Sequence, residues 1–209
     1  MKIEVIFEDN HLLAVVKPAG IPVQKDIGGK EDLQTILKSY LKEKYKKPGE
    51  VYLGIVHRLD QPVGGVMVFA KTSKAASRLS DQIRKNEWRK EYLAVVKGNP
   101  EQRNGYFEDY LLKDSEKNTV TVVSKETKGA KLAKLSYEVV EKTEKRALLK
   151  ILLETGRSHQ IRVQLASRGF PIVNDHRYSR FSKTAGNIAL WAASLTIIHP
   201  VKGEEITFK

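Results

Sequence analysis

The chain has 209 residues, 41% of them hydrophobic and 30% charged, which is enough apolar material for a buried core and too much for a disordered chain. Lys and Arg number 37 against 25 Asp and Glu, and the resulting net charge of +12 favours a polyanionic partner such as RNA, DNA or an anionic membrane. Because there is no cysteine, disulfides, thiolate catalysis and cysteine-based zinc sites are excluded.

The beginning of the chain reads as a β-hairpin followed by a helix. Residues 3–7 and 12–17 have the alternating, β-branched character of strands and are separated by a short polar turn. Pro18 ends the second strand, because proline has no amide hydrogen to donate to a sheet. From Asp32, which can cap a helix, apolar residues follow helical spacing until the helix ends near residues 47–49.

The next segment predicts two strands, a loop between them and a second helix. Residues 52–56 resemble a buried strand that leads into the tetrapeptide HRLD over residues 57–60, and a loop rich in Pro and Gly follows. Residues 66–70 form the second strand, and residues 73–85 have the spacing of an amphipathic helix. The outer face of this helix carries four basic residues, Lys74, Arg78, Arg84 and Lys85.

The rest of the chain is mostly strand, with one further helix. The predicted strands cover residues 92–96, 119–123, 132–140, 147–153, 194–198 and 206–208. Ser158 is placed to cap a helix that Gly169 ends. Strands dominate without regular βαβ repetition, which indicates an α+β fold with a mixed, largely antiparallel central sheet and flanking helices and loops.

Domain organisation and location are also predicted. No internal repeat or convincing linker is visible, so we expect a single catalytic domain over residues 1–209, acting as a monomer. The longest apolar runs have about five residues, far below the roughly 20 that span a bilayer, and the first residues alternate like a strand instead of resembling a signal peptide. A soluble cytoplasmic protein with no membrane association is therefore expected.

Asp60 is the leading candidate for a catalytic residue. It follows a basic residue and a predicted strand, and it opens an irregular loop, which is a common setting for catalytic side chains. A carboxylate there can act as nucleophile or base if a cation keeps it ionised and oriented. The alternative is a structural aspartate that caps the loop and pairs with Arg58.

A second cluster lies in residues 155–162, where Arg157, His159, Gln160 and Arg162 are concentrated. Guanidinium groups and amides suit phosphate and carboxylate alike, although an ordinary helix with a basic face could have the same composition. Likewise, the excess of lysine can simply solvate the surface. No HExxH, GxxxxGK[ST] or GxGxxG pattern occurs, so neither a metal nor a nucleotide cofactor is expected.

Four segments, in order along nearly the whole chain, resemble the RluA-like pseudouridine synthases. They are EDNHLLAVVKPAGIPV at residues 8–23, HRLD with its loop and GVMVFAKT at 57–72, KEYLAVVKG at 90–98, and TGRSHQIRVQLASRGFPIVND with the following HRY at 155–178. The resemblance implies the catalytic fold of that family and a cofactor-independent isomerisation of uridine in structured RNA, either ribosomal or transfer RNA. Since the pattern starts close to residue 1, the S4-like RNA-binding domain of many relatives is expected to be absent.

The resemblance also implies roles for individual residues. Asp60 would initiate cleavage of the uracil glycosidic bond, as nucleophile or as base, and Arg162 would pair with it. Arg58 would hold the target nucleotide, Tyr92 would stack on the base instead of merely filling space, and Leu190 would form an apolar wall. A uridine must leave its stack before the enzyme can reach it, at a cost of about a few kcal/mol. His57, Arg157, His159 and Gln160 are candidate RNA contacts.

Two other functions fit parts of the sequence. The chain could bind or fold RNA with little catalytic role, in which case RNA binding would occur without formation of pseudouridine. It could also hydrolyse nucleosides, but the paired carboxylates that are usual for glycosidases are missing. Release of free uracil would be the sign of that activity.

Overall fold

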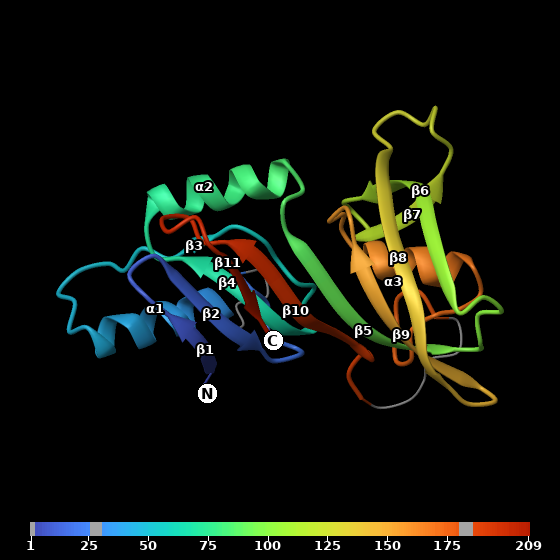
Figure 1. Cartoon of the computed structure of the whole chain (residues 1–209), viewed down its shortest axis with the longest axis horizontal. Coiled ribbons are helices and arrows are strands. Elements are labelled where there is room, and N and C mark those ends of the chain that lie inside the picture. The colour runs from blue at the N-terminus through green and yellow to red at the C-terminus, as the bar shows by residue number, and fades with distance from the viewer. Residues whose placement is uncertain (1–2, 26–30, 180–185) are drawn as a thin grey trace. The chain divides into compact units, whose positions relative to one another are not determined.

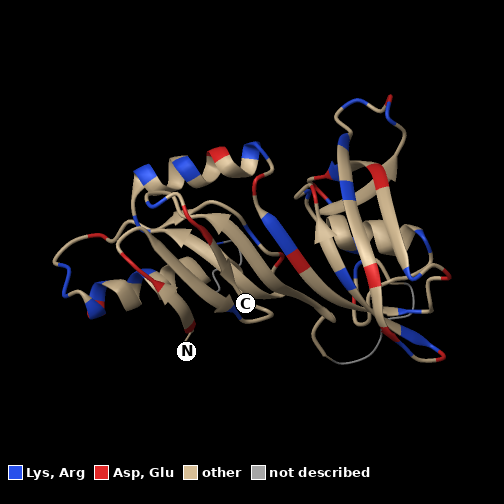
Figure 2. Ribbon diagram, viewed as in Figure 1, with Lys and Arg blue, Asp and Glu red and all other residues tan. Residues whose placement is uncertain are grey.

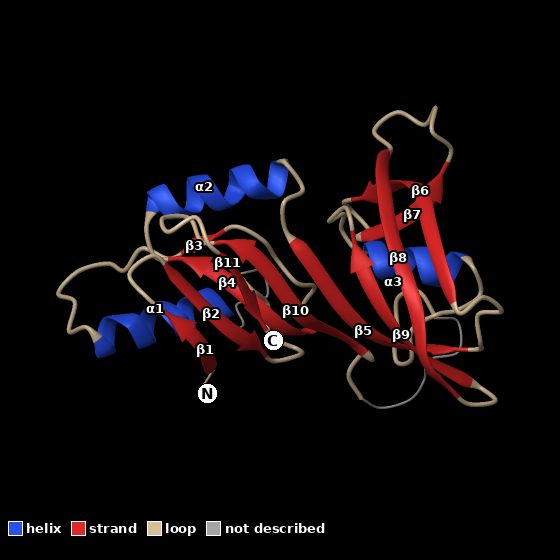
Figure 3. Ribbon diagram, viewed as in Figure 1, coloured by secondary structure: helices blue, strands red, loops and turns tan. Residues whose placement is uncertain are grey.

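The computed structural model of the chain describes residues 3–25, 31–179 and 186–209 (Figure 1). Over these residues the chain forms eleven strands and three helices, and the pairs β1–β2, β2–β4 and β6–β8 are antiparallel. Figure 3 distinguishes the helices from the strands by colour. The α+β class expected from the sequence is confirmed. None of the helices in the described ranges is long and apolar enough to cross a membrane.

The chain divides into two compact units. The first comprises Met1–Arg89 and Ala192–Lys209, and the second comprises Lys90–Trp191. The single domain expected over residues 1–209 stays a prediction, and each unit is described separately below.

The first unit is built on a sheet with the strand order β1-β2-β4-β10, in which β3 pairs with β4 and β11 with β10. Its strands are β1 (Glu4–Glu8), β2 (Leu12–Lys17), β3 (Gly54–Ile55), β4 (Gly64–Ala70), β10 (Leu190–Ile198), which starts in the second unit, and β11 (Glu205–Phe208). Its helices are α1 (Leu33–Lys44) and α2 (Ser73–Arg84).

Strands β2 and β4 lie at the centre of this sheet because both of their faces are apolar. Leu12 of β2 and Val68 of β4 belong to a core cluster with Leu79 of α2. Side chains alternate between the two faces of a strand, so Leu13 and Phe69 point to the opposite side, and both are also fully buried. Full burial of such a side chain contributes about 1.5–3 kcal/mol, which explains the uninterrupted apolar runs of these strands.

Both helices of the first unit begin at a polar cap. The carboxylate of Asp32 accepts a hydrogen bond from the Thr35 amide, as expected from the sequence, and the hydroxyl of Thr72 accepts one from the Ala75 amide. These side chains satisfy amides that the first turn of a helix leaves without partners. Figure 2 shows where Lys and Arg stand along α2, and Lys74, Arg78 and Arg84 are exposed, in agreement with the predicted basic face.

Glu8, at the end of β1, collects four hydrogen bonds that connect β1 to α1 and to the residue after β4. Its carboxylate accepts from Tyr40, Lys44, Tyr45 and Lys71 at 2.6–2.9 Å, and its side chain is only 7% exposed. Burial alone would raise the pKa of Glu8, but these donors lower it from 4.5 to about 2. The charged form of Glu8 is therefore favoured in the folded protein.

The substitution Glu8→Gln is expected to lower the free energy of unfolding at pH 7 by about 2–3 kcal/mol. This value is smaller than the full pKa change of Glu8 implies, because solvent weakens its interaction with the exposed Lys44. A lowered pKa stabilises the fold above the unfolded value, so the effect should vanish as the pH falls from 4.5 to 2. Denaturant unfolding of both proteins across this pH range measures it. Glu4→Gln, on the exposed end of the same strand, is the control and should change stability by less than about 0.5 kcal/mol.

The second unit contains an antiparallel sheet with the order β5-β9-β8-β6-β7. Its elements are β5 (Arg89–Lys97), β6 (Asn104–Asp114), β7 (Thr119–Val123), β8 (Lys131–Lys142), β9 (Arg146–Leu153) and α3 (Gln160–Ser167). Helix α3 packs on β6 and β7, where its Val163 joins a core cluster with Leu111, Val120 and Ala133. Three strands of the sheet thus provide the surface that holds α3.

Three expectations from the sequence need correction. Strand β6 was not predicted, because Gly105 and several charged residues interrupt its apolar pattern. The predicted strand over residues 52–56 is reduced to Gly54–Ile55, and the preceding Tyr52 is 49% exposed. Ser158 does not cap α3, since the cap residue is His159 in a left-handed conformation with φ of 51°.

Candidate active site

In the first unit, the loop that carries Asp60 is joined to the end of β2. The ammonium group of Lys17 donates hydrogen bonds to the carbonyls of Pro18 at 2.9 Å and Gln61 at 3.0 Å. The Gly20 amide donates to the Gln61 carbonyl at 2.8 Å, and the Gln61 side chain donates to the Gly20 carbonyl at 3.1 Å. Two segments about 40 residues apart in sequence are therefore held together next to Asp60.

Lys17 places a buried positive charge in the neighbourhood of Asp60. Its side chain is fully buried, and burial lowers the pKa of Lys17 from 10.5 to about 8, against the opposing effect of the Asp60 charge, which raises it. A buried lysine is uncommon unless it is paired or hydrogen-bonded, and Lys17 has two carbonyl acceptors and the charge of Asp60 near it. From the sequence, Lys17 was expected only to end a strand and to belong to the first segment of the family resemblance.

Replacing Lys17 with methionine should change how stability depends on pH. Folded Lys17 binds its proton less tightly than unfolded Lys17, so raising the pH from 8 to 10.5 favours the folded state. Over that range the wild-type protein should gain up to about 3 kcal/mol of unfolding free energy relative to Lys17→Met. Urea unfolding of both proteins at several pH values measures this difference, and parallel curves for the two would contradict the assignment.

The other end of the Asp60 loop is fixed where it enters β4. The Val63 amide donates a hydrogen bond to the Asp60 carbonyl at 3.0 Å, which closes a turn. Gly65 then has φ of +122°, and a Cβ atom at this position would lie 2.3 Å from the Ala192 carbonyl oxygen. Only glycine tolerates both conditions, so the backbone on this side of Asp60 has little freedom.

His57 and Arg58 differ in their surroundings. The His57 ring accepts a hydrogen bond at Nε2 from the Val68 amide at 3.0 Å and contacts Trp88 edge-on, with ring centroids 5.1 Å apart. This imidazole therefore helps to join the strand before Asp60 to β4. Arg58, in contrast, has an exposed side chain. Their predicted roles toward RNA stay predictions.

In the second unit, Arg162 on α3 forms a buried ion pair with Asp175. The guanidinium donates from Nε and Nη2 to the two carboxylate oxygens, each at 2.8 Å, and the side chains are 6% and 0% exposed. Burial would raise the pKa of Asp175, but the hydrogen bonds and charge of Arg162, with the amides of Arg177 and Tyr178, lower it. The sequence analysis did not single out Asp175, and the pairing of Arg162 with Asp60 stays a prediction.

The start of α3 is organised by the side chains of His159 and Gln160. Nδ1 of His159 lies 2.7 Å from the Tyr178 hydroxyl, which accepts from the Val120 amide at 2.8 Å and is thus placed to donate to the ring. The Gln160 side chain accepts from the Arg157 amide at 3.0 Å and donates to the Lys134 carbonyl at 3.0 Å. Gln160, predicted as an RNA contact, is buried and holds the loop before α3, while α3 itself begins without a side-chain cap.

Tyr92 and Leu190 are positioned by backbone pairing. Tyr92 lies on β5 opposite Ile151 and is partly buried. Leu190 begins β10 and is 5% exposed. The preceding residue, Ala189, accepts a hydrogen bond from the Val95 amide and donates one to Val173. Both side chains are thus held on ordered backbone. The roles predicted for them, a stacking surface for Tyr92 and an apolar wall for Leu190, require such rigid support.

The chain was compared with families, curated proteins and solved structures. A family model described as RNA pseudouridylate synthase matches residues 11–167. The chain is 35% identical over 209 residues to the uncharacterized RNA pseudouridine synthase YhcT of Bacillus subtilis (strain 168), covering 98% of this chain and 67% of that protein. It is 34% identical over 211 residues to the dual-specificity RNA pseudouridine synthase RluA of Escherichia coli (strain K12), covering 98% and 91%. The fold matches human RNA Pseudouridylate Synthase Domain Containing 4 with a TM-score of 0.82 at 24% identity, covering 98% of this chain and 86% of that one.

Proposed function

The chain belongs to the RNA pseudouridylate synthase family and is an isomerase of uridine in RNA, and we propose that Asp60 is its catalytic carboxylate. The observation that carries this proposal is the setting of Asp60, in a loop whose backbone directly after Asp60 is anchored by Lys17 at Gln61 and by Gly65 at the entry to β4. A carboxylate beside a buried cation on a rigid backbone suits attack on one defined atom.

The reaction requires no external group. The bond between the ribose carbon and uracil nitrogen is broken and a bond from the same ribose carbon to a uracil carbon is formed. That uracil carbon loses its proton and the released nitrogen gains one, so substrate and product are isomers. Asp60 would start this exchange, and the released uracil must rotate without escaping, which calls for a closed pocket.

We propose that Arg58, Tyr92, Arg162 and Leu190 bind the target nucleotide. Tyr92 would stack on the uracil, Leu190 would exclude water, and the exposed Arg58 would hold the extruded nucleotide. The guanidinium of Arg162, which Asp175 holds through Nε and Nη2, is proposed to pair with Asp60.

The proposed substrate is structured ribosomal or transfer RNA, bound by a protein that acts as a monomer in the cytoplasm. The net charge of +12 supports binding to a polyanion, and His57, Arg157, His159 and Gln160 are the proposed contacts outside the target nucleotide. Of these, Arg157 has an exposed side chain, whereas Gln160 would act by holding the backbone of Arg157.

The test is to map pseudouridines in all RNA from cells with and without the gene, and then to repeat the reaction with purified protein and the identified transcript. At least one site should disappear from the cells that lack the gene, and the purified protein should restore it. RNA binding without product would replace the catalytic proposal with a role in RNA folding, and free uracil would indicate hydrolysis.

A further inference from the structure

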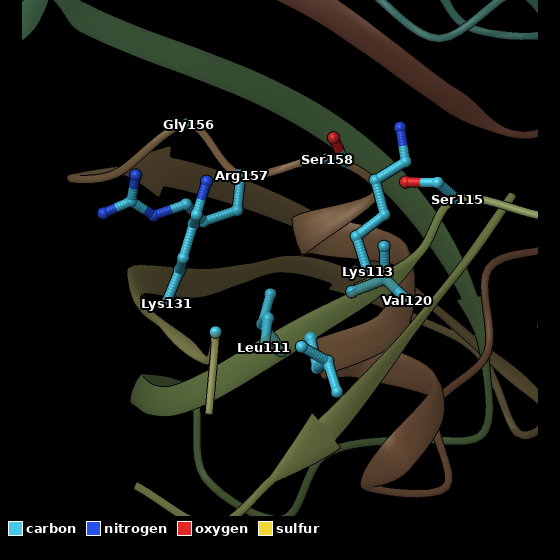
Figure 4. A pocket seen from close by; sticks show the side chains of 10 residues that line it. Leu111, Lys113, Ser115, Val120, Lys131, Gly156, Arg157 and Ser158 are labelled. Atoms are coloured by element: carbon cyan, nitrogen blue, oxygen red, sulfur yellow. The ribbon is translucent and has the colours of Figure 1, made fainter. Parts of the chain in front are cut away.

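The second unit contains a pocket of about 500 Å³ that the residues proposed for catalysis do not explain (Figure 4). It is formed by the end of β6, the start of β8 and the loop before α3. Figure 4 shows Lys113, Lys131 and Arg157 around it, with Leu111 between them. Its volume is within the range of pockets that bind small ligands, about 300–1,000 Å³.

Positive charge gathers at this pocket without compensation. In the described part of the chain, neither Lys113, Lys131 nor Arg157 forms an ion pair with a carboxylate. The Nε of Arg157 donates to the Leu132 carbonyl at 2.8 Å, which fixes the direction of the guanidinium. Like charges held close together repel, so such a cluster is more favourable when an anion is bound.

Lys90 adds a fourth cation next to the same loop. Its Nζ would lie 3.2 Å from a Cβ atom at Gly156, which also lines the pocket. Burial and, to a smaller extent, the charge of Arg157 lower the pKa of Lys90. The described structure provides no carboxylate partner for Lys90 either, so the deficit of negative charge extends below the rim of the pocket.

The floor of the pocket is apolar. Leu111 and Val120 are each 3% exposed and line it together with Leu112, while Ser158 adds a hydroxyl group near Arg157. A site for phosphate alone needs only polar donors, whereas an apolar floor below a cationic rim accommodates a base and its phosphate together. This combination distinguishes a nucleotide from an acidic peptide.

We propose that this pocket binds one unstacked nucleotide of the substrate RNA, other than the uridine that is isomerised. Its base would lie against the apolar lining, where Leu112 is less buried than Leu111 and Val120, and its phosphate would contact Lys113, Lys131 and Arg157. The inference rests on the proposed function only in taking RNA as the partner. It gives the second unit a role in choosing the RNA, because a second unpaired nucleotide of the RNA must reach this pocket.

The test combines two lysine substitutions in the pocket with a matched pair outside it. Lys113→Gln with Lys131→Gln removes two charges from the rim, and Lys142→Gln with Lys145→Gln removes two from the exposed turn between β8 and β9. Binding of the identified transcript is measured by fluorescence anisotropy at several salt concentrations. The pocket pair should raise Kd about tenfold and reduce the slope of log Kd against log salt by about 2, whereas the control pair should change Kd less than about threefold.

A second measurement distinguishes a nucleotide from a phosphate. Photocrosslinking of transcripts that carry 4-thiouridine should attach one nucleotide to a peptide containing residues 111–120, and an abasic nucleotide at that position should weaken wild-type binding several-fold. Equal effects of the two lysine pairs, or no effect of the abasic nucleotide, would overturn the inference. Formation of pseudouridine by the wild-type protein is measured separately on the same transcript. A wrong proposal for the pocket and a wrong proposal for the isomerisation therefore give different results.

Discussion

Asp60→Asn is expected to reduce pseudouridine formation by at least about 10²–10⁴-fold while the protein remains folded and binds RNA. Asparagine has nearly the same shape, but its amide can neither act as a base nor attack carbon. Hydrogen bonds from Lys17, from the Gln61 side chain and between backbone groups hold the loop, and the substitution keeps all of these groups. Single-turnover assays on the identified transcript give the rate, and anisotropy should show a Kd within about threefold of the wild-type value.

Asp114→Asn is a matched control for this experiment. Asp114 is an exposed aspartate at the turn between β6 and β7, where one oxygen accepts from the amides of Glu116 and Lys117 at 3.0 Å. The amide oxygen of asparagine can keep both bonds, so activity should be unchanged. Wild-type activity in Asp60→Asn would remove Asp60 from the reaction, whatever its surroundings.

Asp175→Asn is expected to lower the free energy of unfolding by about 3–5 kcal/mol, the largest stability effect that we predict. The substitution leaves the buried Arg162 guanidinium without its charged partner, and an uncompensated buried charge is very unfavourable. The amide oxygen of asparagine can still accept from the amides of Arg177 and Tyr178, but its NH2 group would then face Nε of Arg162, so the lost stability comes from the guanidinium. Equilibrium unfolding in urea measures the change.

A double-mutant cycle measures the interaction energy between Arg162 and Asp175 apart from their contacts with other residues. Arg162→Met combined with Asp175→Leu should be more stable than the sum of the two single substitutions predicts, because neither buried charge remains. The lowered pKa of Asp175 stabilises the fold above its unfolded value of 3.8, so the difference between wild type and Asp175→Asn should shrink in acid. An Asp175→Asn protein that unfolds like the wild type at pH 7 would contradict the assigned strength of the pair.

Local sequence patterns predicted the elements in which the pattern of apolar and polar residues matches the burial of the side chains. The predicted strands over residues 12–17 and 119–123 coincide with β2 and β7, and Asp32 caps α1 as expected. Strand β6 was missed because it carries Glu108 and Asp109 on an 11-residue strand that is half exposed. Its pairing partners, which are distant in sequence, determine that strand more than its own propensities do.

The candidate site was predictable where a functional side chain lies in a recognisable segment, as Asp60 does. The supporting residues were not. Lys17 looked like the polar end of a strand, and only the packing of β2 against the Asp60 loop shows that it is buried. Asp175 ends the sequence TGRSHQIRVQLASRGFPIVND of the family resemblance, but that segment did not indicate its pairing with a guanidinium 13 residues away on α3. Lys17 lies in the first such segment, directly after an apolar run and before a proline, and neither fact indicated that it is buried.

Gly65 has a consequence for any survey of inactive variants of this protein. Since a methyl group there would collide with the Ala192 carbonyl, even alanine would force β4 and β10 apart beside the loop that holds Asp60. A saturation mutagenesis screen scored by product alone would therefore rank Gly65 with the residues that perform the chemistry. Measuring the amount of folded protein for each variant would tell the two groups apart.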